Sequence, residues 1–506
     1  GLQLILNLIE FCFHQLIIDI ISYMRLPTPI QAKIPYEISP EPMDGAITAF
    51  GGAALLSRLF RSMKLPGSCD ANLGFMRKIE AGYPPGQIVE TIILGLLLGI
   101  DCVEDLEMLR DDAALERLLG YSPPSTRTIR DWLEKFHNAD LVSAAEERAN
   151  ELDLKAIIPE LSNELEALQR VLGTSMRAAA ASTCGETLTS ATIDSDGTII
   201  QSHKATAKVA YDGTKGYQPL TAIWAEADLI VSTQFRDGNV PGHMSPLDCV
   251  KEGFSQLPKS VTQFAFRGDS ANYNCELMDW LDNPERNGGP QGVKIQYAIS
   301  ARMSEELLKT AKSIPESEWN TIPGKNEDDV LRQWSELAYV PSESYERKSS
   351  RPRRYIGLRI IKKQGELFGD GSDRKHFAIV TNRAEAGNLV LQWHREKAGT
   401  IEHTQDELKN ALSAARLPSK LFGANSAWFM LNAIAYNLAT AFRMAIDDPD
   451  LRTARIKRLR FCYFTVTARV TRFSRKMTLR FAKCKEWVKK LLKILKKFPC
   501  RIQPTG

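Results

Sequence analysis

Three acidic positions that lie far apart in the chain could together bind divalent metal ions. Asp194 and Asp196 fall in Ala191-Thr-Ile-Asp-Ser-Asp-Gly-Thr-Ile-Ile, a stretch that is typical of a β-strand. Side chains two residues apart on a strand point to the same face of a sheet. Asp269 follows a second strand-like stretch, Val261-Thr-Gln-Phe-Ala-Phe. Carboxylates at the ends of buried strands are costly unless a cation such as Mg²⁺ or Mn²⁺ neutralises them.

A third acid could come from a later helix. The segment Thr400-Ile-Glu-His-Thr-Gln-Asp-Glu-Leu-Lys predicts a helix on which Glu402 and Lys409 share one face. Glu402 could then hold metal while Lys409 reaches a phosphate. Two-metal phosphoryl transfer needs such a set, because one ion activates the attacking oxygen and the other stabilises the leaving oxygen, with the ions about 3.5–4 Å apart. Other acids remain open as ligands: Asp194 in place of Asp196, and Glu396, Asp406 or Glu407 in place of Glu402.

The order of elements around these acids predicts an α/β domain of the ribonuclease-H-like class. Three strand-like stretches are followed by a helix, a strand, a helix and a strand, at 191–200, 220–225, 229–233, 245–257, 261–266, 275–281 and 293–299. We expect residues 186–300 to form the first part of the catalytic core. Residues 301–388 predict a β-rich insertion, and residues 389–445 predict the last helices of the core.

The chain before this core predicts a helical domain at residues 44–185. Within it, a Pro/Gly turn precedes Ser125-Thr-Arg-Thr-Ile-Arg-Asp-Trp-Leu, which begins with capping residues and carries Arg127 and Arg130. This pattern is typical of a helix-turn-helix DNA reader, although short helical hairpins also occur without that role. Residues 1–43 are apolar but interrupted by charges, which favours neither a membrane span nor a secretion signal. We assign them no function.

Charge is distributed unevenly along the 506 residues. From Leu451 onward there are 18 Lys and Arg against the single acid Glu486, a balance of +17, whereas the preceding residues have 47 bases and 60 acids, or −13. We expect residues 446–506 to be a basic helical tail that contacts a polyanion, the alternative being a solvated basic helix. Its removal after Leu451 should weaken DNA binding and flatten the salt dependence. The nine scattered cysteines favour a reducing cytoplasm, and we expect no membrane.

Three segments resemble the catalytic blocks of bacterial insertion-sequence transposases. The first is Asp194-Ser-Asp-Gly-Thr, followed by Lys215-Gly-Tyr-Gln-Pro-Leu and Arg236-Asp-Gly-Asn. The second is Phe266-Arg-Gly-Asp-Ser-Ala-Asn-Tyr, and the third runs from Trp393-His-Arg-Glu-Lys-Ala-Gly-Thr-Ile-Glu to Phe422-Gly-Ala-Asn-Ser-Ala-Trp. The likeness is to the insertion sequence 1380 family, within the DDE transposases that carry a β-strand insertion before the last acid.

This resemblance implies Asp196, Asp269 and Glu402 as catalytic residues and as ligands of two Mg²⁺ or Mn²⁺ ions. Asp196 is preferred to Asp194 because the related pattern is an Asp followed closely by Thr. The superfamily's third block has a Tyr and an Arg before the Glu, whereas Arg395 and Ala398 stand there in this chain. The phosphate contacts are therefore expected from a different set: Lys409, Arg395, Lys397 and Arg267, the last of which could instead form a salt bridge.

The resemblance also implies a transposition pathway and its partners. The enzyme would bind terminal inverted repeats as a homodimer, cleave at the element ends and join the freed 3′-hydroxyl to target DNA, in the bacterial cytoplasm at the nucleoid. Related enzymes stack a flipped base on an aromatic residue of the insertion; Trp334 is the candidate, and a core position is the alternative. Two other functions remain open: another ribonuclease-H-like nuclease such as a junction resolvase, and a catalytically inactive DNA-binding protein derived from a transposase.

Overall fold

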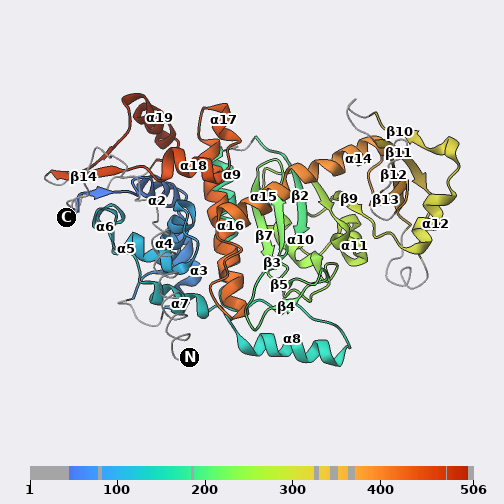
Figure 1. The fold of residues 1–506 in the computed structure, drawn as a ribbon, viewed down its shortest axis with the longest axis horizontal. Coiled ribbons are helices and arrows are strands. Elements are labelled where there is room, and N and C mark those ends of the chain that lie inside the picture. Colours follow the sequence, from blue (N-terminus) through green and yellow to red (C-terminus); the bar gives the residue numbers. More distant parts are fainter. Residues whose placement is uncertain are drawn as a thin grey trace, which may run out of the picture. The chain divides into compact units, whose positions relative to one another are not determined.

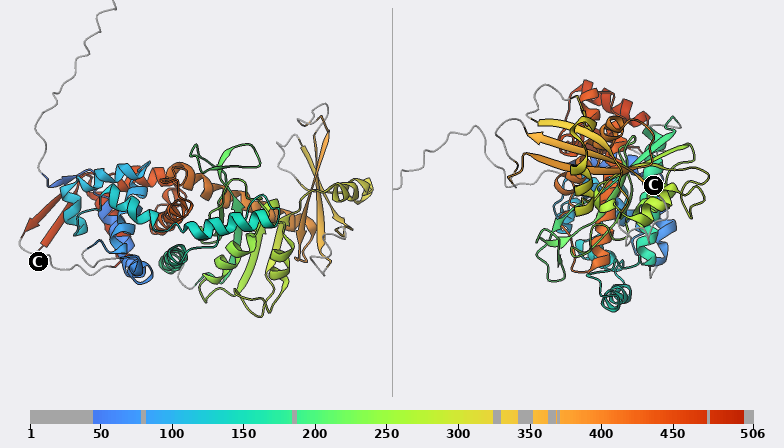
Figure 2. Two further views of the ribbon diagram at one scale, coloured as in Figure 1. Left: turned by 90° about the horizontal axis from the view of Figure 1, so that it is seen from below. Right: turned by 90° about the vertical axis from the view of Figure 1, so that its right-hand side faces the viewer.

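A computed structural model provides the structure of the chain (Figures 1 and 2). It describes residues 45–77, 82–183, 187–323, 330–341, 352–362, 368, 371–473 and 476–499. The apolar segment 1–43, to which the sequence analysis assigned no function, lies outside the described residues.

The first described part is built of helices, as its sequence predicts. Its main helices are α2 (Ala53–Ser62), α3 (Leu65–Leu73), α4 (Pro85–Leu98), α6 (Ala113–Leu119), α7 (Thr126–Glu134), α8 (Ala139–Glu151) and α9 (Asn163–Thr183). α4 is buried along nearly its whole length. Among the described residues no single helix is long and apolar enough to cross a membrane, although α4 and the bent continuation Val103–Arg110 pass that test as a pair.

One helical stretch of this domain is interrupted. Residues 103–119 have apolar residues at helical spacing, but the structure has a 3₁₀ turn at Val103–Leu106, then α5 (Glu107–Arg110) and α6. The side chain of Asp112 accepts a hydrogen bond from the Leu115 backbone N–H at 2.8 Å and thereby caps a new helix. Helical periodicity alone does not detect such a cap, because the apolar positions continue across it.

The central feature is a nine-stranded mixed sheet in the order β10-β11-β12-β13-β9-β8-β2-β6-β7. Its core strands are β2 (Ser190–Gly197), β6 (Leu220–Trp224), β7 (Leu229–Gln234), β8 (Gln263–Gly268) and β9 (Gln296–Ser300). β8 pairs in parallel with both β2 and β9, whereas β6 and β7 are antiparallel. Helices α10 (Pro246–Ser255) and α11 (Cys275–Asp282) connect β7 to β8 and β8 to β9. Within this sheet the order is the predicted one of three strands, helix, strand, helix and strand. Between β2 and β6 the chain also forms a small sheet of β3 (Ile200–Gln201), β4 (Lys208–Val209) and β5 (Lys215–Tyr217), which was not predicted.

The β-rich insertion continues this sheet. After α12 (Glu305–Ser313), the strands β10 (Asn320–Thr321), β11 (Val330–Leu337), β12 (Arg354–Lys362) and β13 (Arg374–Thr381) follow, drawn in yellow and orange in Figure 2. β13 pairs antiparallel with β9, with Ile379 opposite Ser300. Trp334 packs so closely on Gly387 that a Cβ there would lie 2.3 Å from its ring. Its half-buried ring therefore serves packing of the insertion against the next helix.

The last core helices are α14 (Gly387–Arg395), α15 (Ile401–Asp406) and α16 (Phe422–Met444). α14 contacts β9 and β11 and α15 contacts β2, whereas α16 lies between the sheet and the N-terminal helices (Figure 1). α16 is buried and packs against α9, α4 and β7. Its Asn437 side chain accepts a hydrogen bond from the Ile230 N–H at 2.8 Å and donates to the Ile230 carbonyl at 2.9 Å, so it pairs with β7 much as a strand would.

The C-terminal region differs from the predicted basic helical tail. It contains α17 (Pro449–Arg452), α18 (Ile456–Leu459) and α19 (Lys485–Lys496), but also the antiparallel strands β14 (Ala468–Phe473) and β15 (Lys476–Phe481). β14 also pairs with β1 (Ile47–Thr48) near the other end of the described chain. Residues 468–470 and 476–481 alternate buried or half-buried apolar with exposed polar side chains, the period of a strand. High charge concealed this alternation at the sequence level.

Candidate active site

Two of the predicted acids lie at the same end of adjacent parallel strands. Ser195 of β2 is opposite Gly268 of β8, so Asp196 and Asp269 each follow the last paired residue. Burial raises the pKa of Asp196 to about 6, an effect that the nearby Lys397 ammonium opposes and the negative charge of Asp269 increases. The two carboxylates are therefore close enough to repel one another at neutral pH.

Asn272 ties these two strand ends together. Its side-chain amide donates to the Asp269 carboxylate at 2.9 Å and to the Ser195 carbonyl at 3.2 Å. The same carboxylate oxygen accepts from the Ala271 N–H at 3.1 Å, since Asp269 caps a short 3₁₀ turn. These bonds hold the Asp269 carboxylate in one orientation at the end of β8.

Asp194, the sequence alternative to Asp196, is fully buried and already paired. Both of its carboxylate oxygens accept hydrogen bonds from Arg267, at 2.6 and 2.9 Å, and the Thr400 hydroxyl also donates to it. Arg267 is buried as well, and its third nitrogen contacts the Trp393 carbonyl at 2.8 Å and Glu396 at 3.0 Å. Arg267 had been predicted to bind phosphate or to form a surface salt bridge; in this structure its guanidinium is engaged in a buried one.

The segment between α14 and α15 lies directly over both aspartates of β2. The Lys397 ammonium is 3.0 Å from the Asp196 carboxylate, and Thr400 reaches Asp194, so both aspartates face this segment as the strand period predicted. His394 Nε2 lies 3.0 Å from the Gly268 carbonyl. Because a carbonyl only accepts, this nitrogen carries the proton, and burial lowers the pKa of His394. A neutral imidazole therefore supports the strand end before Asp269.

Glu402 is not brought together with the other two acids. It is exposed in the first turn of α15, and no hydrogen bond or ion pair joins it to another described residue. In the described ranges, no group of three or more His, Cys, Asp or Glu side chains is arranged to hold a metal ion. The competing acids have other partners: Glu396 pairs with Arg267, Asp406 with Arg455, and Glu407 accepts from the Ile456 N–H.

The helix that carries Glu402 is also not a regular α-helix. It changes to a π-helix at Glu407–Ala411, so the shared face predicted for Glu402 and Lys409 does not extend over the whole interval. The change coincides with the buried bond of the Glu407 carboxylate to the Ile456 N–H at 2.6 Å. Single π-helical turns of this kind are frequent at functional sites.

The other predicted DNA contacts lie on the surface to different degrees. Arg395 is exposed and Lys409 half-buried, and neither forms an ion pair within the part of the chain that the structure describes. On α7, Arg127 is 91% exposed and 3.9 Å from Asp131, whereas Arg130 forms an ion pair with Glu104. Arg127 and Arg395 are therefore the freest cations of the predicted set.

Sequence reasoning missed several groups that build the site. His394 and Thr400 belong to the third sequence block and Asn272 to the second, but the sequence analysis gave none of them a role. Two buried oxygens beside the aspartates, Asn272 Oδ1 and Thr221 Oγ1, have no hydrogen-bond partner among described residues; Thr221 is opposite Asp196 in β6. Such groups are satisfied by water or by a hydrated ion. Only the fold could identify them, because β6 and β8 are distant from β2 in sequence.

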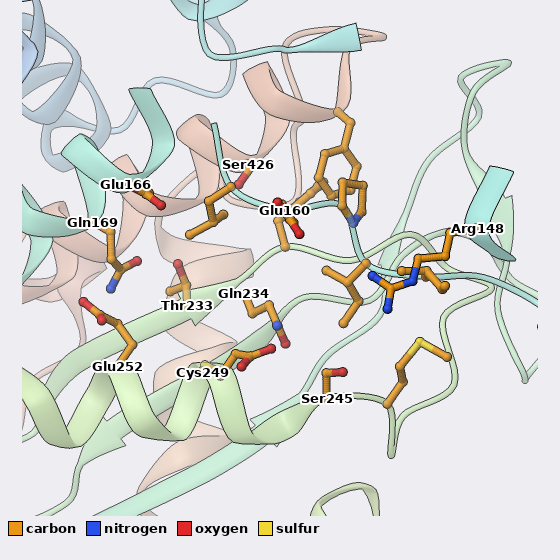
Figure 3. A pocket seen from close by; sticks show the side chains of 18 of the residues that line it. Arg148, Glu160, Glu166, Gln169, Thr233, Gln234, Ser245, Cys249, Glu252 and Ser426 are labelled. Atoms are coloured by element: carbon orange, nitrogen blue, oxygen red, sulfur yellow. The ribbon is translucent and has the colours of Figure 1, made fainter. Parts of the chain in front are cut away.

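A cavity of about 920 Å³ opens beside the edge strand β7, between α9, α10 and α16 (Figure 3). Its charged lining consists of four acids and two bases: Glu160, Glu166, Asp248, Glu252, Arg148 and Arg170. Buried Gln169 and Ser426 also line it. The excess of acids repels phosphate, so this cavity is unsuited to the DNA backbone.

Comparisons with known proteins give a family and distant structural likenesses. The family model described as "Transposase DDE domain group 1" matches residues 38–501. A solved structure titled "Cryo-EM structure of piggyBac transposase synaptic complex with hairpin DNA (SNHP)" is similar at 11% sequence identity and a TM-score of 0.38, covering 81% of this chain and 79% of that one. No curated protein matches the chain.

Proposed function

The chain belongs to the family of transposase DDE domains, and on this premise we propose that it cleaves DNA at the ends of a mobile element and joins them to target DNA. We assign the catalytic roles to Asp196, Asp269 and Glu402. The observation that carries the proposal is the placement of Asp196 and Asp269 at the ends of the parallel strands β2 and β8, where the negative charge of Asp269 adds to the raised pKa of Asp196. Asp194 differs, because both of its carboxylate oxygens are bonded to the buried Arg267 guanidinium.

The residues present fit a Mg²⁺ or Mn²⁺ ion held by Asp196 and Asp269. Two carboxylates in a partly buried site favour a hard cation, and the Lys397 ammonium already stands in for one beside Asp196. The unpartnered oxygens of Asn272 and Thr221 leave room for metal-bound water. Such an ion supplies activation of an attacking oxygen and stabilisation of a leaving one. A second ion needs Glu402, which lies on the helix beside β2 and would have to turn toward the two aspartates.

Asp196, and not Asp194, is proposed as the first ligand. Asp194 uses both oxygens on Arg267 and receives the Thr400 hydroxyl, so a metal ion would have to displace all three bonds. Asp196 has a single cationic partner, Lys397, whose flexible side chain can move to a phosphate when an ion binds. Arg395 and Lys409 border the same segment and are proposed as further phosphate contacts, with Arg127 and Arg130 of α7 reading the element ends.

We further propose that this is a bacterial insertion-sequence transposase of the 1380 family, acting in the cytoplasm at the nucleoid. The three sequence blocks support this assignment, since they contain both aspartates, Lys397 and Glu402 in order. It would act as a homodimer on paired terminal inverted repeats. The long β insertion between β9 and α14 favours a transposase over a junction resolvase, which has no use for it.

The test is cleavage of a duplex carrying the element's own ends, with Mg²⁺ or Mn²⁺. We expect the wild type to cleave, and Asp269→Asn and Asp196→Asn to lower the rate at least a thousandfold while duplex binding changes less than threefold. Glu276→Gln, at an exposed position of the following helix α11, is the control for loss of one acidic charge and should cleave normally. Cleavage by Asp269→Asn at the wild-type rate would contradict the assignment of the catalytic triad. A wild type that binds but never cleaves with either ion would instead identify an inactive, transposase-derived DNA-binding protein.

A further inference from the structure

The hairpin formed by β14 and β15 has two faces of opposite character. Residues directly opposite in an antiparallel pair share a face, as do residues two apart on a strand. One face therefore comprises Ala468, Val470, Leu479, Phe481, Arg472 and Met477. Ala468 and Val470 are buried, and the Phe481 ring lies 5.3 Å from Trp487 of α19. This face anchors the hairpin to the body of the protein.

The opposite face of the hairpin, here called the ribbon face, consists of the pairs Arg469–Arg480, Thr471–Thr478 and Phe473–Lys476. At its base, the half-buried Ile47 of β1 lies beside Arg469 on the same side, and beyond that pair the ribbon has two strands only. All six side chains are exposed except that of Thr471, which is half-buried. Phe473 is 87% exposed, an unusual position for a large aromatic ring. The ribbon face thus has three positive charges, two hydroxyls, one ring and no acid.

Arg469 and Arg480 are directly opposite one another, with Cβ atoms about 5 Å apart, and like charges in such a pair destabilise a sheet. No ion pair within the described chain relieves either of them. Other bases of the same region behave differently: Arg455 pairs with Asp406, Lys497 with Asp447, and Arg460 bonds to the carbonyls that end α4. The ribbon face therefore differs from a generally basic tail, since its charges have no internal use.

We infer that the ribbon face binds duplex DNA by lying in the major groove. That groove is about 12 Å wide and admits a two-stranded β-ribbon. Arg469, Arg480 and Lys476 would contact phosphates or guanine edges, Thr471 and Thr478 would face base edges, and Phe473 would pack on a thymine methyl group. The inference rests on the proposed function only in taking DNA as the partner. In Figure 2 (left) the two strands are the red arrows that extend beyond the neighbouring helices.

A membrane surface is the other polyanion that a basic face with an exposed ring could meet. The observations favour DNA, because membrane-binding faces carry a continuous apolar strip and the ribbon face has a single apolar residue between hydroxyls and charges. Binding to anionic vesicles is therefore one outcome of the test.

The experiment measures affinity of the full-length protein for a random 20-base-pair duplex between 0.05 and 0.3 M salt, without divalent metal. Arg469→Gln with Arg480→Gln removes two phosphate contacts. The slope of log affinity against log salt should become shallower by about 1.8, and affinity at 0.15 M should fall on the order of tenfold. Lys259→Gln with Lys309→Gln, two exposed lysines elsewhere in the chain, is the charge-matched control and should change neither. Phe473→Ala should weaken binding without altering the slope.

Two further measurements keep the result unambiguous. The double arginine variant should unfold at the same temperature as the wild type or higher, because it loses a like-charge pair, whereas a structural role would lower that temperature. Netropsin, which fills the minor groove, should not change the difference in DNA affinity between the double arginine variant and the wild type. Three results would overturn the inference. They are an unchanged salt slope in the double arginine variant, loss of the affinity difference when netropsin is present, and an effect of the substitutions on binding to phosphatidylserine vesicles but not to DNA. A wild type that never cleaves but shows the ribbon effect would refute only the proposed catalysis.

Discussion

At the scale of single residues, the site separates two aspartates that the sequence could not distinguish. Asp194 and Asp196 are two apart on one strand and face the same segment, yet Asp194 bonds through both oxygens to a buried guanidinium and Asp196 pairs with the single ammonium of Lys397. The difference arises from the neighbours supplied by β8 and by residues 393–400. It leaves Asp196 with a raised pKa and Asp194 as a structural group.

A prediction at this scale concerns Asp237, which follows β7. Burial raises the pKa of this carboxyl to about 6, with Lys208 opposing the shift and Glu146 adding to it. A raised pKa means that the folded state binds the proton more tightly, so stability from this group is lost as pH rises from about 4 to about 6. Asp237→Asn should therefore raise stability at pH 7 by on the order of 1–2 kcal/mol, and the gain should vanish toward pH 4.

The measurement is the unfolding temperature of wild type and variant between pH 4 and pH 7.5. Asp111→Asn, at an exposed position, serves as the control for loss of one acidic charge. A difference between Asp237→Asn and wild type that stays constant across this range would contradict the assignment.

At the scale of elements, a buried ion-pair network attaches the segment between α14 and α15 to the sheet. Arg267 of β8 bonds to Asp194 of β2 and, from the other side, to Glu396 and the Trp393 carbonyl, and its guanidinium lies 5.2 Å from the Trp393 ring. Lys397 of the same segment pairs with Asp196, and His394 near the end of α14 bonds to the Gly268 carbonyl at the end of β8. The position of the site therefore depends on this attachment as much as on the strands.

We expect Asp194→Asn to loosen this attachment. Removing one partner leaves the Arg267 charge buried and undercompensated, which costs about 3–5 kcal/mol. Asp196→Asn is the matched control, two residues along the same strand face, and should lower stability less than Asp194→Asn, because burial already disfavours the Asp196 charge that pairs with Lys397. Urea unfolding together with hydrogen exchange in residues 393–402 would measure both. Equal stability of the two variants would contradict a structural role for Asp194.

At the scale of the whole described chain, the C-terminal region is part of the core. Ile456, Leu459, Phe464, Leu491, Ile494 and Phe498 are buried in the same hydrophobic cluster as α4, α9 and α16. Removing the tail after Leu451, expected from the sequence to weaken DNA binding, would therefore also remove part of the core. The segment 456–498 thus supplies both most of the tail's positive charge and part of the buried apolar core.

Truncation after Leu451 should therefore prevent stable folding and give an aggregated product, since burial of six large apolar side chains is lost at roughly 2 kcal/mol each. Truncation after Pro499 should leave the unfolding temperature within a few degrees of the full chain. Soluble yield and circular dichroism of the two products check this. A folded, soluble protein ending at Leu451 would contradict the role of the tail in the core.

Local patterns were sufficient for much of this protein. The order of strands and helices from β2 to β9, the turn that presents Asp269 and the shared face of Asp194 and Asp196 follow from hydrophobic period and chain order, which are properties of neighbouring residues. Long-range pairing decided the rest. Asp194 is neutralised by Arg267, which is 73 residues away in the sequence. Asp196 and Asp269 lie together only because β2 and β8 are adjacent in the sheet. The ribbon face exists only because β14 pairs with β15. Such contacts leave no periodic trace in the sequence, since each depends on which surfaces the folded chain brings together.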